Sequence, residues 1–146
     1  MRLLAVWPLV IAATLVHCAD CATAASDLPS IRMTETGLEN QEWSIERYYD
    51  GANLVPAIAT SRIVFVNGRV EGTPGCGSLI ASYTLSATRL SVASFGLVLG
   101  GYCVDALLSQ SKGITKLLSG ELTIERAGQR LVLRNADGVI QVVLGP

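Results

Sequence analysis

The chain has 146 residues and nearly balanced charge, with 11 basic residues, 12 acidic residues and a formal net charge of -1. This length fits a short leader followed by one small globular domain. The balance argues against nucleic acid or an anionic membrane surface as the main partner, because both select clusters of Lys and Arg.

The first predicted element is an export signal at residues 1–24. Arg2 precedes an apolar run from Leu3 to Val16, and the small residues Ala22-Thr23-Ala24 follow it, which is the pattern that signal peptidase cleaves. The run is shorter than the ~20 residues that span a bilayer. We therefore expect cleavage after Ala24 or Ala25 and a protein in the periplasm, with secretion as an alternative.

The leader also contains a second candidate processing site, at Cys18. The preceding Leu15-Val16-His17 has the outline of a bacterial lipobox, in which the cysteine is cleaved and lipidated. His17 departs from the Gly, Ala or Ser that usually stands there, so plain cleavage is favoured. Lipidation at Cys18 stays open as the alternative, and it would make the protein an outer-membrane lipoprotein.

A flexible lead is expected at residues 25–41, and the folded domain is expected at residues 42–146. Alternation of apolar and polar residues predicts strands in this domain, as where Leu131 and Leu133 alternate with Arg130, Val132 and Arg134. The pairs Asn67-Gly68 and Asp137-Gly138 are typical of hairpin turns. The strands are predicted at residues 42–49, 62–66, 69–71, 79–85, 89–93, 121–125, 130–134 and 139–144.

One helix is predicted at about residues 104–119, where the period changes to about 3.6 residues. Its expected apolar face carries Leu107, Leu108, Ser111, Ile114 and Leu118, and Gly120 ends it. Strands, one helix and three further strands indicate an α+β domain. We expect an antiparallel β-sheet curled into an incomplete barrel around this single helix.

Two cysteines, Cys76 and Cys103, remain once the leader is removed, and the only histidine, His17, is lost with it. In an oxidising compartment two such cysteines are most simply a structural disulfide. The alternative, a reactive thiolate, normally needs a neighbouring base. Without histidine the mature chain cannot form a Ser-His-Asp triad, and it contains no recognisable metal site. We expect no enzyme activity and no cofactor.

One catalytic motif does occur within the predicted helix. Ser109-Gln110-Ser111-Lys112 fits S-x-x-K, the nucleophile signature of penicillin-interacting enzymes, but the K-T-G and S-D-N motifs that accompany it are absent. We interpret these residues as polar positions on the helix surface.

The order of several residues resembles the META/HslJ domain family over roughly 42–144. These are Trp43 in the first strand, Gly72 before Gly75-Cys76, Ser82-Tyr83 on the next strand, Cys103 at the start of the helix, and the closing segment GQRLVLRNADGVIQVVL. The family pattern usually has Asn where this chain has Gly77, and Gly where it has Ala81.

The resemblance implies an exported or membrane-associated bacterial protein, linked to heat stress, drug tolerance or virulence, with no established catalytic residues. The family fold is similar to that of secretin pilot proteins, whose cracked barrel holds an apolar ligand or a partner helix. We therefore expect a non-enzymatic envelope protein that binds a lipid-like ligand or a partner protein. The alternative is a periplasmic inhibitor of a host or rival enzyme, similar to a lysozyme inhibitor.

A candidate apolar binding surface lies between Gly72 and Asp105, where Arg89 is the only charged residue. This stretch can line a groove for an acyl chain or a partner helix. It can equally form two core strands and the wall of a small barrel. The side chains assigned to the candidate surface are Tyr83, Phe95, Leu97, Leu99 and Tyr102.

Overall fold

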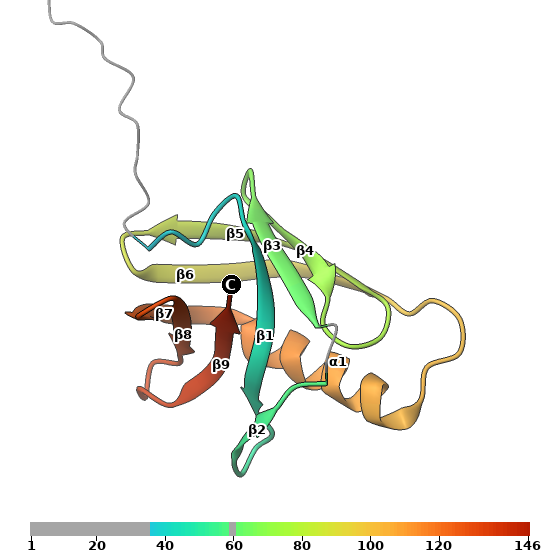
Figure 1. Cartoon of the computed structure of the whole chain (residues 1–146). Coiled ribbons are helices and arrows are strands. Elements are labelled where there is room, and N and C mark those ends of the chain that lie inside the picture. The colour runs from blue at the N-terminus through green and yellow to red at the C-terminus, as the bar shows by residue number, and fades with distance from the viewer. Residues whose placement is uncertain (1–35, 59–60) are drawn as a thin grey trace, which may run out of the picture. The chain divides into compact units, whose positions relative to one another are not determined.

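The computed structural model describes residues 36–58 and 61–146 (Figure 1). The leader, Cys18, the cleavage site at Ala24 and most of the expected lead lie outside these residues. The described residues form nine strands and one helix, in the order β1 (Glu42–Tyr49), β2 (Leu54–Pro56), β3 (Arg62–Val66), β4 (Arg69–Thr73), β5 (Ser78–Ser86), β6 (Arg89–Val98), α1 (Asp105–Leu118), β7 (Gly120–Ala127), β8 (Arg130–Arg134) and β9 (Ile140–Gly145).

The predicted α+β architecture is confirmed. The strands form one antiparallel sheet in the order β2-β1-β3-β4-β5-β6-β7-β8-β9. An additional pairing of β1 with β9 joins the two sides, so that the sheet curls into a ring. Several strands turn every second residue to the inside of this ring, as Leu79, Ala81 and Tyr83 show in β5.

The helix lies beside the second half of β6, which has no pairing with β7. Within β6, only Arg89–Val92 pair with β7, so the second half of β6 has β5 as its only strand neighbour among the described residues. The six residues Ala93–Val98 span about 20 Å, and a helix of 14 residues spans about 21 Å. α1 contacts β6, β1 and β9, and it buries Ile114 and Leu118 in the core.

Two strand predictions need correction. β2 was not predicted, because its three residues, Leu-Val-Pro, are too few to show a period of two. β6 continues to Val98, although the segment after Ala93 was read as a loop. The cause is a β-bulge, in which Ser94 and Phe95 of β6 face the single residue Ala81 of β5. Ser94 has a positive φ of 56°.

The bulge also changes which residues of β6 point inward. Leu90 and Val92 are buried before it, whereas Phe95 and Leu97 take the inward positions after it and are half-buried. A one-residue insertion reverses the faces of a strand, because side chains alternate with a period of two. The alternation is therefore broken in the sequence even though the strand continues.

The fold begins before residue 42. Leu38 is completely buried in the core, and its carbonyl accepts a hydrogen bond from the Trp43 indole N–H at 2.8 Å. The backbone N–H of Asn40 donates to the carbonyl of Phe65, also at 2.8 Å. Residues 36–41, which the sequence analysis placed in a flexible lead, are thus packed against the sheet.

Candidate functional site

Tyr83, the first of the five apolar candidates, lies inside the sheet and apart from the other four. Its side chain is 6% exposed, and its ring packs edge-on against Phe65 with the centroids 5.3 Å apart. Its hydroxyl donates a hydrogen bond to the Glu39 carboxylate. Burial and this hydrogen bond, together with the negative charge of Glu39, raise the pKa of the Tyr83 phenol.

We expect Tyr83 to make stability depend on pH in alkaline solution. A phenol with a higher pKa in the folded chain binds its proton more tightly when folded. Its contribution is therefore complete below the ordinary phenol pKa of about 10 and is lost as the pH rises above it. When the pH is raised from about 8 to about 11, the melting temperature of Tyr83→Phe should fall less than that of the wild type, as measured by circular dichroism.

Tyr102 provides the control, because its side chain is 94% exposed and changes its surroundings little on unfolding. Tyr102→Phe should show the same pH dependence as the wild type. An equal loss of melting temperature in Tyr83→Phe and the wild type would contradict the prediction.

The remaining four candidates lie along one continuous segment. Phe95 and Leu97 are half-buried at the end of β6, whereas Leu99 is 46% exposed and Tyr102 is 94% exposed. Val98 and Val104 are also exposed. We call residues 98–104 the apolar loop, because these seven residues contain no charge. The loop projects from the sheet between β6 and α1 (Figure 1).

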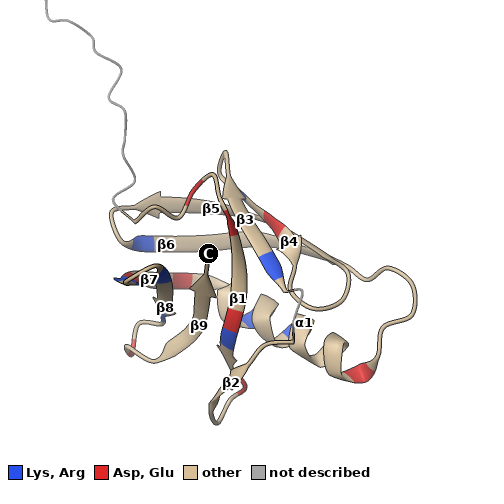
Figure 2. Cartoon of the chain, viewed as in Figure 1, with Lys and Arg blue, Asp and Glu red and all other residues tan. Residues whose placement is uncertain are grey.

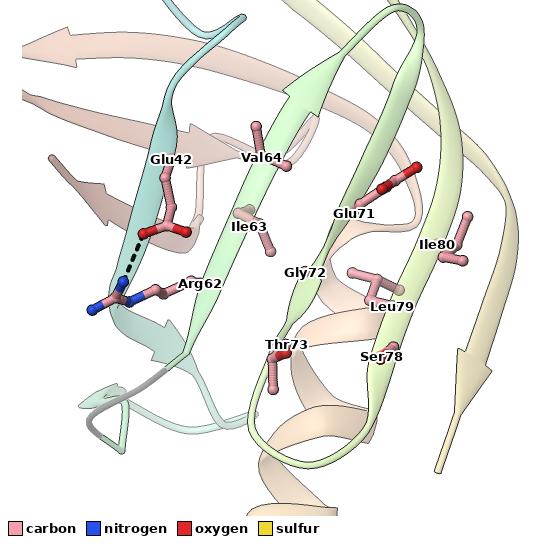
Figure 3. Close-up of a pocket in the computed structure, with 10 residues that line it drawn as sticks. All are labelled: Glu42, Arg62, Ile63, Val64, Glu71, Gly72, Thr73, Ser78, Leu79 and Ile80. Carbon is pink, nitrogen blue, oxygen red and sulfur yellow. Dashed lines mark hydrogen bonds and ion pairs between the residues drawn. The ribbon is translucent and has the colours of Figure 1, made fainter. Parts of the chain in front are cut away.

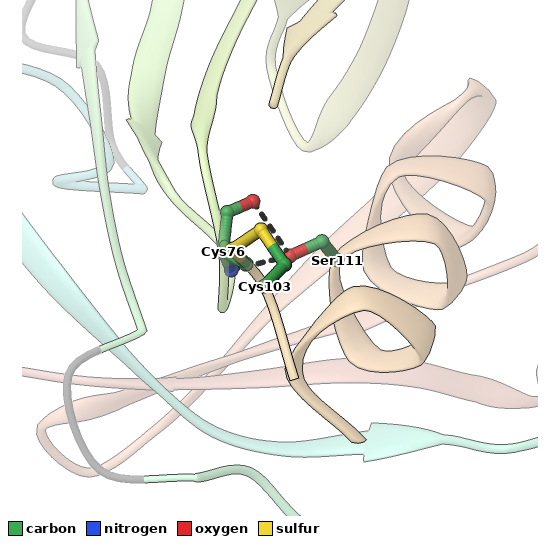
Figure 4. The surroundings of a disulfide bond; sticks show 3 residues. All are labelled: Cys76, Cys103 and Ser111. Carbon is green, nitrogen blue, oxygen red and sulfur yellow. Dashed lines mark hydrogen bonds between the residues drawn. A yellow bond between two sulfur atoms is a disulfide. The ribbon is translucent and has the colours of Figure 1, made fainter. Parts of the chain in front are cut away.

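A disulfide holds this loop to the turn between β4 and β5. Cys76 and Cys103 are bonded, with their Cα atoms 6.0 Å apart, as predicted. The Ser111 hydroxyl lies beside the bond (Figure 4), where it accepts from the Cys76 N–H at 2.6 Å and donates to the Cys76 carbonyl at 3.0 Å. Loop, turn and helix are thus joined at one point.

The position next to Cys76, Gly77, requires a glycine. Its φ is +81°, and a Cβ there would lie 2.3 Å from the Val98 carbonyl oxygen. Only glycine allows both this conformation and this close approach. The turn can therefore lie directly against the backbone of the apolar loop.

A buried polar cluster continues inward from Ser111, and sequence reasoning missed it. Gln110 is 1% exposed; its Oε1 accepts from the Ile58 N–H at 2.8 Å, and its Nε2 donates to Ser61 Oγ at 2.5 Å and to the Pro74 carbonyl at 2.9 Å. The expectation that the S-x-x-K residues lie on the helix surface is therefore wrong for Gln110, whereas Ser111 is buried on the face where its spacing from Ile114 and Leu118 placed it. For Gln110, the spacing of four residues from the buried Ile114 was the available signal.

The two outer residues of that motif, Ser109 and Lys112, are exposed, as expected. Within the described residues no hydrogen bond between these two side chains is observed.

A groove of about 480 Å³ crosses β1, β3, β4 and β5 (Figure 3). An ion pair joins Arg62 and Glu42 at 2.7 Å along one wall, with side chains 60% and 62% exposed. Exposed pairs of this kind contribute roughly 0–1 kcal/mol. None of the five apolar candidates lines this groove.

A second groove, of about 400 Å³, separates α1 from the end of β1, and we call it the helix groove. It also contains none of the five candidates. Its lining residues come from the end of β1, the turn after it, the helix and β9: Tyr48, Tyr49, Asp50, Gly51, Ser109, Gly113, Lys116, Leu117 and Gln141.

Charged residues are distributed over many elements, with both signs interspersed (Figure 2). In the described part of the chain, no group of three or more His, Cys, Asp and Glu residues is placed to hold a metal ion. None of its helices is long and apolar enough to span a membrane.

The sequence was compared with models of known domain families. The family model of the META domain matches residues 36–144. The chain belongs to the META domain family. The match begins at residue 36, which agrees with the burial of Leu38. No curated protein matches the chain.

Two solved structures share the fold of this META domain, and both were determined by NMR. One aligns with a TM-score of 0.56 and 15% identity over 74% of this chain and 90% of its own. The other, from Burkholderia xenovorans, aligns with a TM-score of 0.58 and 14% identity over 74% of this chain and 82% of its own. At these identities the likeness concerns the fold alone.

Proposed function

We propose that this META domain is a non-enzymatic binding protein of the bacterial cell envelope. The leader exports it to the periplasm, and the apolar loop holds an apolar ligand or a partner protein there. The observation that carries the proposal is an exposed, uncharged segment in which Leu99 is 46%, Val98 63% and Tyr102 94% exposed.

The anchoring of the loop supports this proposal. A binding segment that is already ordered loses less conformational entropy when its ligand arrives. The Cys76–Cys103 disulfide fixes one end of the loop, and the close approach of Gly77 supports the other end at Val98 and Leu99. Exposed apolar side chains on an anchored segment are typical of interaction sites.

The runner-up is an inhibitor that inserts a loop into an enzyme of a host or rival. The loop projects, which suits such a role, but it offers neither a carboxylate nor a cation to a catalytic cleft. Binding through apolar area is therefore the proposal that the composition of the loop favours.

The proposal is tested with the purified mature protein. We expect it to retain lipid-like molecules, detected by mass spectrometry of an organic extract, and to bind a fluorescent apolar probe. Leu99→Asp should weaken probe binding about tenfold, because it loses apolar burial and places a charge in the contact.

Val139→Asp is the matched control, because Val139 is 41% exposed in the turn between β8 and β9. That turn lies on the other side of the domain from the apolar loop (Figure 1). The control should bind as the wild type does, and both variants should melt within a few degrees of it. Failure to take up any apolar probe would leave only the inhibitor or a scaffold role.

A further inference from the structure

The helix groove owes its floor to a residue that the helix itself does not favour. Gly113 lies inside α1, and glycine is a much poorer helix former than alanine. Its position faces the Tyr48 ring, where an added Cβ would lie 3.7 Å from Cε2. That distance is an ordinary van der Waals contact, so packing against Tyr48 does not require a glycine.

The effect of glycine at this position is to leave space. The groove has a volume of about 400 Å³, within the range of about 300–1,000 Å³ that is usual for small-molecule sites. Tyr48 and Leu117 pack against the core and present their remaining surface to the groove beside Gly113. The floor is therefore apolar.

The rim carries one cation that is available to a ligand. Lys116 lines the groove and forms no ion pair among the described residues. The other charged residue there, Asp50, turns its Oδ1 into the turn after β1, where it accepts from the N–H groups of Ala52 at 2.9 Å and Asn53 at 2.8 Å. These bonds lower the pKa of Asp50, so its carboxylate stays negatively charged, and a negative group of a ligand has to lie at the Lys116 ammonium rather than at the turn.

An apolar floor beside one cation is complementary to a molecule with an apolar body and one negative group. We propose that the helix groove binds a small amphipathic carboxylate, with its body against Gly113, Tyr48 and Leu117 and its carboxylate on the Lys116 ammonium. This site shares no residue with the apolar loop. The proposal is therefore independent of the function proposed above.

The probes are phenylbutyrate and its uncharged counterpart phenylbutanol, each titrated into the mature protein and followed by amide proton–nitrogen NMR spectra. We expect shifts at the amides of Gly51, Gly113 and Gln141. Phenylbutyrate should bind about fivefold more tightly than phenylbutanol, the ratio expected for one exposed ion pair. Lys116→Gln should remove that difference, whereas Lys112→Gln, on the same helix but outside the groove, should preserve it.

Substitutions at Gly113 separate binding from stability. Gly113→Ala should raise the melting temperature, because alanine favours the helix, and should weaken binding of both probes. Gly113→Leu should block the groove for both. If Gly113→Leu fails to fold, Gly113→Ala still decides, since a variant that is more stable and yet binds less cannot be explained by unfolding.

Several outcomes would overturn the proposal. They are equal affinity for the two probes, unchanged binding in both Gly113 variants, or no shift up to the solubility limit of the probes. Shifts confined to residues 98–104 would reject the helix groove while supporting the apolar loop. Tighter binding of an uncharged saccharide or an amine than of phenylbutyrate would assign the groove to that other chemistry.

Discussion

Replacing Cys103 by serine is expected to lower the melting temperature of the mature protein by about 10–15 °C. The disulfide links residues 27 positions apart, and closing a loop of that length stabilises a fold by about 3 kcal/mol, mainly by restricting the unfolded chain. Cys76→Ser and the double variant should show the same loss, because each removes the same bond. Differential scanning calorimetry measures it.

The disulfide variants also test whether Cys76 is structural. Ligand binding should remain measurable at low temperature, because Ser111 still joins the helix to the turn through its two hydrogen bonds with Cys76 or its replacement. Thiol labelling of the native exported protein should find no free thiol at either position. Two freely reactive thiols, or complete loss of binding at unchanged stability, would show that the cysteine is chemically active.

The parts of the fold that the sequence could predict are those set by local periodicity. β1, β3, β5, β7 and the helix bury residues at the spacing that their secondary structure requires. The disulfide followed from elimination, because two cysteines remain in a domain that we expect to be exported. Neither prediction depends on the order of the strands in the sheet.

The polar cluster could not be found in this way, because its partners are distant in the sequence. Gln110 bonds to residues 36, 49 and 52 positions away. Sequence patterns treat a glutamine on a helix as exposed, and only tertiary packing shows that backbone groups at Ile58 and Pro74 need a partner there. A buried polar residue in contact with distant backbone groups leaves no local signature.

The candidate sites were only partly predictable for a related reason. The scarcity of charge between Gly72 and Asp105, where Arg89 is the only charged residue, marked an apolar stretch but did not separate the buried Tyr83 from the exposed Tyr102. Tyr83 is buried because β5 turns it inward, whereas Tyr102 is exposed because it follows the end of β6 at Val98. The helix groove depends on Gly113 facing Tyr48, a contact between elements 65 positions apart in the chain that no local pattern records.

The second large effect is expected at Gln110. Gln110→Ala removes the partner of the Ile58 N–H and one of the two donors to the Pro74 carbonyl, which keeps the Ser61 hydroxyl, and it leaves a cavity beside Ser61. Unsatisfied buried groups cost about 1–3 kcal/mol each, and cavities add to this. We expect a loss of about 3 kcal/mol in the free energy of unfolding, measured by urea denaturation.

A methionine at this position separates the two causes, because Gln110→Met nearly preserves volume but cannot hydrogen-bond to the cluster. It should lose about 2 kcal/mol if the hydrogen bonds dominate, and much less if the cavity does. Ser109→Ala, at the exposed neighbouring position, is the control and should change stability by less than about 0.5 kcal/mol. Because the cluster ties the helix to the turn that carries Cys76, Gln110→Met should also increase hydrogen exchange at Ile58 and Cys76. Unchanged exchange together with unchanged stability would show that Gln110 is not what holds α1 against the sheet.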